Sequence, residues 1–202
     1  MYRLYDYLPS GNGYKVRLLL TQLGVAFELI ELDIVKGESR TSGFLAKNPN
    51  GRIPTLEVES GVFLPESNAI LFYLAEGTAF FPTDRLARAQ VLQWMCFEQY
   101  SHEPNIATVR FWLQHLGVNE ERRAVLEQKR ALGYAALGVM EQHLARRAFF
   151  VDEHYSIADI ALYAYTHVAE EGGFDLAPYA AVRAWLERVR AQPRHIPITA
   201  RA

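Results

Sequence analysis

The chain is organised around Asn48–Leu74, which reads NPNGRIPTLEVESGVFLPESNAILFYL. A proline cannot donate to a sheet ladder, so Pro54 must begin a strand or lie at a sheet edge. The Ile53–Pro54 bond is also an X-Pro peptide bond, the only type of peptide bond that is commonly cis. A cis bond here would turn the N–H and C=O of Ile53 outward beside the sheet, where they can pair with an extended peptide. The stretch therefore predicts a strand from Thr55 and a backbone clamp at Ile53.

Glu66 and Ser67 open an apolar helix within the same stretch. The free N–H groups at a helix start favour an anion. An acid and a hydroxyl also suit the first turn of any helix, so the pair by itself has a purely structural interpretation. Beside a backbone clamp, the pair completes a site for a short peptide with a free α-carboxylate.

The first part of the chain predicts a thioredoxin-like domain with the element order βαβ(α)ββα, at residues 1–78. Two strand-like runs enclose a helical pattern that is stopped by Gly24, which predicts a parallel pair with a right-handed crossover. A polar segment then leads to two further strands and a helix. The predicted strands are residues 2–7, 26–32, 55–58 and 62–64, and the predicted helices contain Val16–Leu23 and Ser67–Glu76.

The rest of the chain predicts an all-helical domain at residues 85–202, after a linker at residues 79–84. Its first helix, up to about Leu116, is expected to kink or break at Pro104. Ser156 and Asp159 have the spacing of a capping box. Strands first and only helices afterwards give an α+β class, with a thioredoxin-like domain followed by a helical bundle.

The composition excludes several classes of function. Half of the residues are apolar and the net charge is −2, so we expect neither nucleic acid nor membrane as a partner. The N-terminus lacks the pattern of a signal peptide, and one cysteine, Cys96, cannot form an intramolecular disulfide. We therefore expect a reducing, cytoplasmic setting. Cys96 has apolar neighbours and is expected to be buried and inert. No Cys/His spacing indicates a metal site.

Three motifs carry a resemblance to the glutathione transferase family. They are NPNGRIP-x-L followed by ESNAI, SGNGYKVRLLL near the start, and YSIADI near the end. The resemblance extends over nearly the whole chain. The chain is similar to bacterial, cytosolic-type members of the family with theta-like and nu-like features. It implies glutathione as co-substrate, no metal, and a homodimer in which the first domain of one subunit packs on the helical domain of the other.

The resemblance leaves two candidates for activating the thiol of glutathione. Ser10–Val16 resembles the segment of theta-like enzymes in which a serine hydroxyl donates to the sulfur. Asn12 and its neighbours resemble the nu-like pattern, in which an asparagine and a nearby hydroxyl share this task. Local sequence alone favours a turn or cap role for Ser10. We expect Ser10 to matter more than Asn12 for transfer to an aryl group.

The same resemblance implies the contacts to the rest of the tripeptide. Arg52 and Ile53 line it, with the Ile53 backbone holding the cysteinyl unit. The acid Glu66 holds the γ-glutamyl amino group, and Ser67 holds the γ-glutamyl carboxylate.

One motif departs from the theta-like pattern K-G-x-H, in which a histidine follows the second strand. The matching run is Lys36-Gly37-Glu38-Ser39, so Ser39 stands in place of that histidine. The contact to the glycyl carboxylate therefore falls to Ser39, Lys36 or Arg40.

The helical half contains a run of aromatic side chains that we expect to be mostly core. Tyr100 and His102 are expected to be the exposed members and to wall a pocket for the second substrate. Asp159 resembles the acid of the family's folding box and is expected to be structural.

The sequence leaves three functions open. The first is a glutathione transferase that directs the thiolate at a small electrophile. The second is a glutathione-dependent disulfide reductase, as the nu-like resemblance allows. The third is a non-enzymatic interaction protein that keeps the fold. This alternative is disfavoured because the set of site residues is complete, namely Ser10, Ile53–Pro54 and Glu66–Ser67.

Overall fold

The computed structural model describes residues 1–201, and the chain forms two compact units. The first contains Met1–Glu76 together with the segment from Pro193 onward, and the second contains Gly77–Gln192. The first unit holds a sheet with helices and the second holds helices, so the predicted fold class is confirmed. Within residues 1–201, no helix combines the length and apolar composition needed to cross a membrane.

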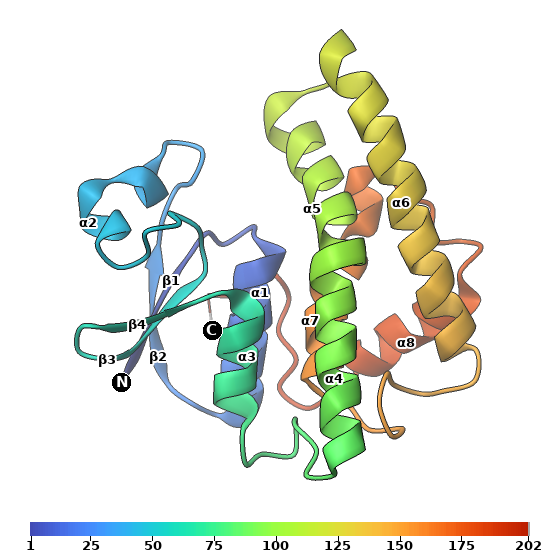
Figure 1. Cartoon of the computed structure of the whole chain (residues 1–202), viewed down its shortest axis with the longest axis horizontal. Helices are drawn as coiled ribbons and strands as arrows, with labels where there is room; N and C mark the ends of the chain where they lie inside the picture. The colour runs from blue at the N-terminus through green and yellow to red at the C-terminus, as the bar shows by residue number, and fades with distance from the viewer. Residues whose placement is uncertain (202) are drawn as a thin grey trace. The chain divides into compact units, whose positions relative to one another are not determined.

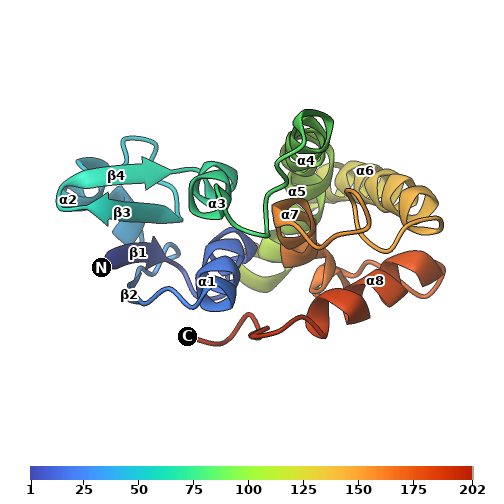
Figure 2. The ribbon, with the colours of Figure 1, turned by 90° about the horizontal axis from the view of Figure 1, so that it is seen from below.

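The first unit is built on a four-stranded sheet in the order β2-β1-β3-β4. The central strand β1 pairs in parallel with β2 and antiparallel with β3, and β3 pairs antiparallel with β4. Helices α1 and α3 lie next to each other on one face of the sheet, and α2 lies on the other (Figures 1 and 2). The bounds are β1 Tyr2–Asp6, α1 Gly11–Leu23, β2 Phe27–Glu31, α2 Ser42–Leu45, β3 Thr55–Glu59, β4 Val62–Pro65 and α3 Ser67–Ala75.

The strand register places four leucines in one row across this sheet. Leu4 is paired with Leu29 on one side and with Leu56 on the other, and Leu56 is paired with Leu64. Paired residues share a face of the sheet, so the row forms one continuous apolar band. Leu4 and Leu56, at its centre, are fully buried. This band fixes the register, because a slip by one residue would turn the leucines to the other face.

Helix α1 starts earlier than the apolar pattern suggests, because the run of turn-forming residues before Val16 is itself helical. Ser10 is the N-cap and accepts a hydrogen bond from the N–H of Gly13. Gly13 lies against the carboxylate of Asp6, where a Cβ atom would come within 1.6 Å of an oxygen, so only glycine fits. Gly24 ends the helix in the left-handed conformation with φ 69°, as predicted.

The C-terminal segment is tied to α1 through Arg17. Its guanidinium is fully buried, pairs with Asp6 at 2.9 Å, and donates to the carbonyl oxygens of Leu8, Ile198 and Ala200. The Tyr14 hydroxyl donates to the carbonyl oxygen of Ile196 at 2.6 Å. Residues from Pro193 onward therefore belong with the first unit, whereas the sequence assigned them to the helical domain.

The second unit consists of helices that follow one another along the chain (Figure 1). Pro104 lies in the first turn of α5, and the five residues before that helix form a π-helical turn. A proline lacks the N–H of a regular turn, so the wider turn accommodates it, and the predicted interruption is confirmed. The bounds are α4 Arg85–Phe97, α5 Glu103–Phe111, α6 Glu120–Leu144, α7 Ile157–Thr166 and α8 Ala180–Arg190.

Asp159 connects three segments of the second unit. One carboxylate oxygen accepts from the backbone N–H and the hydroxyl of Ser156, at 2.9 and 3.2 Å, which forms the predicted capping box. The other accepts from the N–H of Phe150 at 3.2 Å and from the indole N–H of Trp185 at 2.9 Å. The side chain is fully buried, and its contacts agree with the expected structural role.

Two predicted exposures in this unit are wrong. Cys96 is exposed, because the buried stripe of α4 runs through Val91, Trp94 and Met95, and Cys96 faces away from it. His102 is fully buried, and its Nε2 atom lies 2.9 Å from the hydroxyl of Thr166. It falls in the π-helical turn, which shifts the phase of the helix face. Tyr100 is 89% exposed, as predicted.

We predict a pH-dependent cost for Asp159→Asn. Burial raises the pKa of Asp159 to about 6, above its ordinary value, so protonation favours the folded chain. The resulting stabilisation is complete below about pH 4 and is lost as the pH rises through about 6. The cost of the substitution in free energy of unfolding should therefore be larger at pH 4.5 than at pH 7, by about 2 kcal/mol.

Urea unfolding at several pH values measures this difference. Asp152→Asn is the matched control, because Asp152 is exposed and its φ of 49° suits asparagine. A cost for Asp159→Asn that is independent of pH, or equal to that of the control, would contradict the prediction.

Candidate functional site

The sheet register brings the predicted site residues to one end of the sheet. Tyr5, near the end of β1, is paired with Thr55 at the start of β3, and Thr55 is paired with Pro65 at the end of β4. Strand β2 runs parallel to β1 and therefore ends on the same side. Four segments with candidate site residues adjoin this end of the sheet. Their residues are Ser10 and Asn12, Lys36 and Ser39, Arg52 and Ile53, and Glu66 and Ser67.

The Ile53–Pro54 peptide bond is cis, as predicted. Pro54 is buried, Ile53 is half-buried, and β3 starts directly afterwards at Thr55. Arg52 is exposed. The predicted clamp residue therefore lies at the surface, next to the end of the sheet.

Asn48, which sequence reasoning missed, fixes the loop before this bond. Its amide donates to the carbonyl oxygen of Arg52 at 2.8 Å and to the hydroxyl of Thr55 at 3.2 Å. Its side-chain oxygen accepts from the N–H of Asn50 at 3.1 Å, as in an Asx turn. The run N-P-N-G carries the signal for such a turn, since asparagine hydrogen-bonds the backbone two residues further on.

Ser10 combines a cap role with a free hydroxyl proton. Its oxygen accepts from the N–H of Gly13 at 3.5 Å. A serine hydroxyl has one donor in addition to its acceptor lone pairs, so this bond leaves the proton to another partner. The side chain is half-buried. The structural interpretation and the catalytic one are therefore compatible.

Asn12 is linked across the unit to Ser67. The side-chain oxygen of Asn12 accepts from the hydroxyl of Ser67 at 3.2 Å and from the Nζ atom of Lys15 at 2.8 Å. Asn12 is half-buried, and Ser67 is buried. The segment predicted to face the thiol is thus joined to the segment predicted to hold the γ-glutamyl carboxylate. The link is direct, between Asn12 and Ser67, and also passes through Lys15, which the sequence did not indicate.

Glu66 has a backbone conformation that side chains rarely adopt. Its φ is 70° and its ψ is 110°, and its own side chain does not cap the helix that follows. Non-glycine residues in such regions carry on the order of 1–3 kcal/mol of strain and cluster at functional sites. The side chain is exposed at the start of α3, where it can meet a ligand.

The three candidates for the glycyl carboxylate differ in their surroundings. Ser39 is buried in a short 3₁₀ segment, Glu38–Arg40. Lys36 is exposed and pairs with Asp33 at 3.0 Å, and the hydrogen bond to that carboxylate raises the pKa of Lys36. Arg40 donates to the carbonyl oxygen of Asn50 at 2.9 Å. Arg40 and Lys36 therefore offer charge at the surface, and Ser39 lies beneath it.

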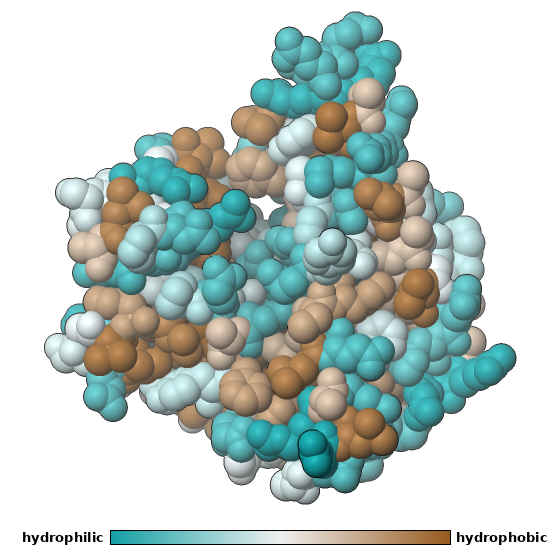
Figure 3. Space-filling view, in the orientation of Figure 1, coloured by the Kyte–Doolittle hydropathy of each residue, from teal (hydrophilic) through white to brown (hydrophobic). Residues whose placement is uncertain are grey.

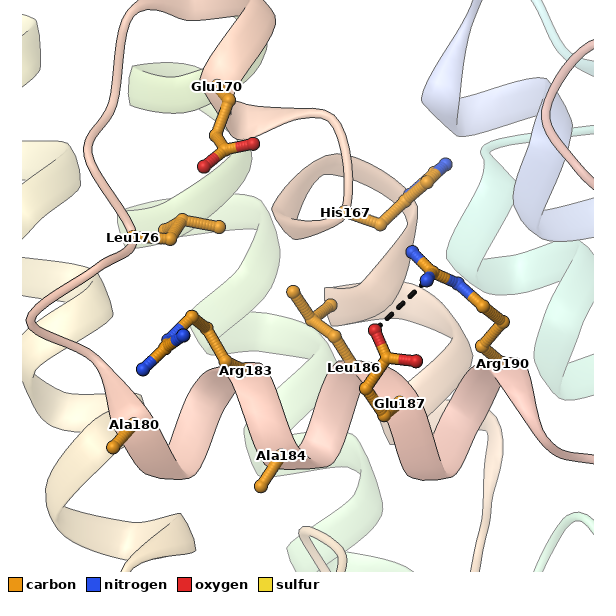
Figure 4. A pocket seen from close by; sticks show the side chains of 9 residues that line it. All are labelled: His167, Glu170, Leu176, Ala180, Arg183, Ala184, Leu186, Glu187 and Arg190. Atoms are coloured by element: carbon orange, nitrogen blue, oxygen red, sulfur yellow. Dashed lines mark hydrogen bonds and ion pairs between the residues drawn. The ribbon is translucent and has the colours of Figure 1, made fainter.

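A separate pocket of about 460 Å³ lies in the second unit (Figure 4). Side chains of α8 line one side of it, with His167 and Glu170 opposite, and Arg190 donates to Glu187 at 3.0 Å. Neither Tyr100 nor His102 lines this pocket. Because His102 is buried against Thr166, the expectation that it walls an open pocket is wrong, while Tyr100 is exposed.

Residues 1–201 hold no group of three or more His, Cys, Asp or Glu side chains placed to bind a metal ion. The expectation that the protein works without a metal stays a prediction.

Comparison with known proteins identifies the family. Residues 1–76 match the family model of the glutathione S-transferase N-terminal domain, and residues 91–193 match that of the C-terminal domain. The chain belongs to the glutathione S-transferase family. This agrees with the resemblance carried by the three sequence motifs.

Individual relatives show the same relationship in more detail. A crystal structure of a glutathione S-transferase from Pseudomonas fluorescens is 54% identical and has a TM-score of 0.96, with 98% of this chain and 99% of that chain covered. The disulfide-bond oxidoreductase YfcG of Escherichia coli is 32% identical over 93% of this chain and 89% of its own length. A transferase homologue from Lodderomyces elongisporus, solved with two GSH per subunit, is 25% identical with a TM-score of 0.86, and 96% and 94% of the two chains are covered.

We predict that Glu66→Gly separates stability from ligand binding. Glycine adopts positive φ without strain, so the variant should be at least as stable as the wild type in thermal unfolding. The glycine variant loses the carboxylate, so its affinity for glutathione should fall. Glu66→Gln also loses the charge and should bind glutathione as weakly, but it keeps the strained backbone and should not be more stable than the wild type. A glycine variant that unfolds several degrees earlier and binds glutathione normally would contradict this assignment.

Proposed function

We propose that the protein is a glutathione transferase that activates the thiol of glutathione for attack on a small electrophile. One observation carries the proposal: three segments that resemble the family's glutathione-binding motifs, and a fourth in which Ser39 stands in place of the expected histidine, leave the sheet at the same end. Two of these segments are joined through Asn12 and Ser67. The similarity to the Pseudomonas fluorescens transferase supports it.

The proposed contacts follow the tripeptide along this end of the sheet. Glu66 pairs with the γ-glutamyl amino group, and Ser67 with the N-terminus of α3 receives the γ-glutamyl carboxylate. The backbone of Ile53 pairs with the cysteinyl unit in strand fashion, and Arg52 lies beside it. Lys36, Arg40 or Ser39 receives the glycyl carboxylate.

The chemistry requires only a modest stabilisation of the thiolate. A free thiol has a pKa of about 8.5, and the thiolate is the nucleophile. Lowering that pKa by about two units corresponds to roughly 2.7 kcal/mol. A hydrogen bond to a charged acceptor contributes about 1.5–3 kcal/mol, and a helix N-terminus about 0.3–1 kcal/mol. One donor from Ser10 or Asn12, at the start of α1, is therefore sufficient without a general base.

We predict that Ser10→Ala raises the pKa of bound glutathione by about one to two units, because a charge-assisted hydrogen bond is lost. Its affinity for glutathione should change little, since the carboxylate and backbone contacts remain. The pH profile of kcat/KM with an aryl halide measures this shift, and Asn12→Ala is the comparison. If Ser10→Ala leaves the acidic limb in place and Asn12→Ala moves it upward, Asn12 is the activating residue.

A glutathione-dependent disulfide reductase is the second candidate. The similarity to YfcG, named a disulfide-bond oxidoreductase, favours it, as does the relative solved with two GSH per subunit. Turnover of a mixed disulfide in the presence of glutathione, without aryl transfer, would establish this activity instead. A protein that binds no glutathione would point to the non-enzymatic alternative.

We also propose that the protein is a cytoplasmic C2 homodimer. Large apolar side chains are exposed on both units, among them Phe72 and Tyr73 on α3 and Leu92 and Tyr100 in and after α4. On the face shown in Figure 3, apolar residues lie in small groups among polar ones. A C2 pair in which the first unit of one subunit packs on the helical unit of the other, as the family resemblance implies, would cover both sets.

We predict a mass of two chains by light scattering at micromolar concentration, and a single-chain mass for Tyr100→Glu, because the introduced charge would be buried at the interface. Glu121→Gln, at an exposed position of α6, is the control. A wild-type protein with the mass of one chain would contradict the dimer.

A further inference from the structure

Lys15 is a fully buried cation whose side chain ends among three oxygen atoms of the candidate site. Its Nζ atom donates to the side-chain oxygens of Asn12 at 2.8 Å, Ser67 at 3.3 Å and Asn68 at 3.4 Å. Burying an ammonium group is costly unless hydrogen bonds compensate it, so these bonds tie the lysine to the side chains around it.

The lysine determines the orientation of the Asn12 amide. An ammonium group has three donors and no acceptor, so the Asn12 atom beside it must be the oxygen. The Ser67 hydroxyl donates to the same oxygen at 3.2 Å. The NH₂ group of Asn12 is therefore the end turned away from Lys15, and it is a donor suited to a thiolate sulfur. Without the cation, the amide could rotate by half a turn and present an acceptor instead.

The lysine also connects the two ends of the proposed ligand. Ser67 follows Glu66 at the start of α3, where the γ-glutamyl carboxylate is proposed to bind, and Asn12 lies in the first turn of α1, where the sulfur is proposed to bind. A positive charge beneath both positions favours both anions. Fixing the two side chains in advance also lowers the entropy cost of ordering them when the ligand binds.

Other charged groups on α1 and at the ends of α3 have positions of their own. Arg17, two residues further along α1, pairs with Asp6 of β1 and binds carbonyl oxygens of the C-terminal segment. Glu66 and Glu76, the residues that flank α3 at its two ends, are exposed. Lys15 is thus a buried cation with hydrogen bonds to both Asn12 and Ser67.

We propose that Lys15 is a positioning residue, which holds the Asn12 amide with its NH₂ group toward the glutathione sulfur and couples this orientation to Ser67. The inference rests on the proposed binding of glutathione. It requires that Lys15 act through Asn12, so the two residues should not contribute independently.

The experiment is a double-mutant cycle of Lys15→Met and Asn12→Ala. The readouts are the affinity for glutathione, by calorimetry, and the pKa of the bound thiol, from the ultraviolet absorbance of the thiolate. Lys15→Met should raise the thiol pKa by about one unit, a roughly tenfold loss of thiolate at a pH below that pKa. In the Asn12→Ala background, the same substitution should shift the pKa far less.

Lys47→Met is the matched control, because Lys47 is a half-buried lysine of the same unit that lies over the rings of Tyr5 and Phe63. It should leave the thiol pKa unchanged. Lys15→Arg keeps the charge with a different geometry and should give a smaller shift in the same direction. If Lys15→Met does not fold, as judged by circular dichroism, Lys15→Arg takes its place in the cycle.

The outcomes separate the inference from the proposed function. A wild-type protein that binds no glutathione overturns the proposed function and this inference with it. A wild-type protein that binds glutathione and lowers its thiol pKa, with Lys15 variants that keep this pKa, overturns only the inference. Equal shifts in the presence and absence of the Asn12 amide would show that Lys15 does not act through Asn12, which also overturns it.

Discussion

The candidate site depends on the pairing of Thr55 with Tyr5 on one side and with Pro65 on the other. This register sets the start of β3 beside the ends of β1 and β4, so that segments far apart in the sequence leave the sheet together. The row of leucines through Leu4 and Leu56 holds the register, since a one-residue slip would turn a buried apolar band to the other face. Packing in the core therefore determines the geometry of the surface site.

Helix α1 connects that site to the rest of the unit through two buried cations. Lys15 is directed at Asn12 and Ser67, and Arg17 at Asp6 and the C-terminal segment. Each is fully buried, so the helix position and the placement of the side chains around each cation are coupled. Gly13 lets Asp6 approach the helix closely enough for this arrangement. The start of α1, where the thiol is proposed to bind, is thus held by charge interactions beneath it as well as by the Ser10 cap.

Local patterns predicted much of this correctly. Proline, glycine and capping residues have strong preferences of their own, which is why the Ile53–Pro54 bond, the Gly24 stop and the Ser156–Asp159 box could be identified from the sequence. The burial of His102 could not, because a π-helical turn changes the phase of the helix face. The exposure of Cys96 could not either, because its apolar neighbours in the sequence belong to the buried stripe of α4, while Cys96 faces away from that stripe. Contacts between distant segments, such as Lys15 with Ser67 or Arg17 with Ile198, leave no local signal.

The central claim is that glutathione binds at the end of the sheet where these segments meet, and a crystal structure with glutathione tests it most directly. The account predicts the γ-glutamyl group at Glu66 and Ser67, the cysteinyl unit paired with the backbone of Ile53, and the sulfur within hydrogen-bond distance of Ser10 or Asn12. Glutathione in another place, such as the pocket lined by His167 and Arg190, with this end of the sheet empty, would contradict it.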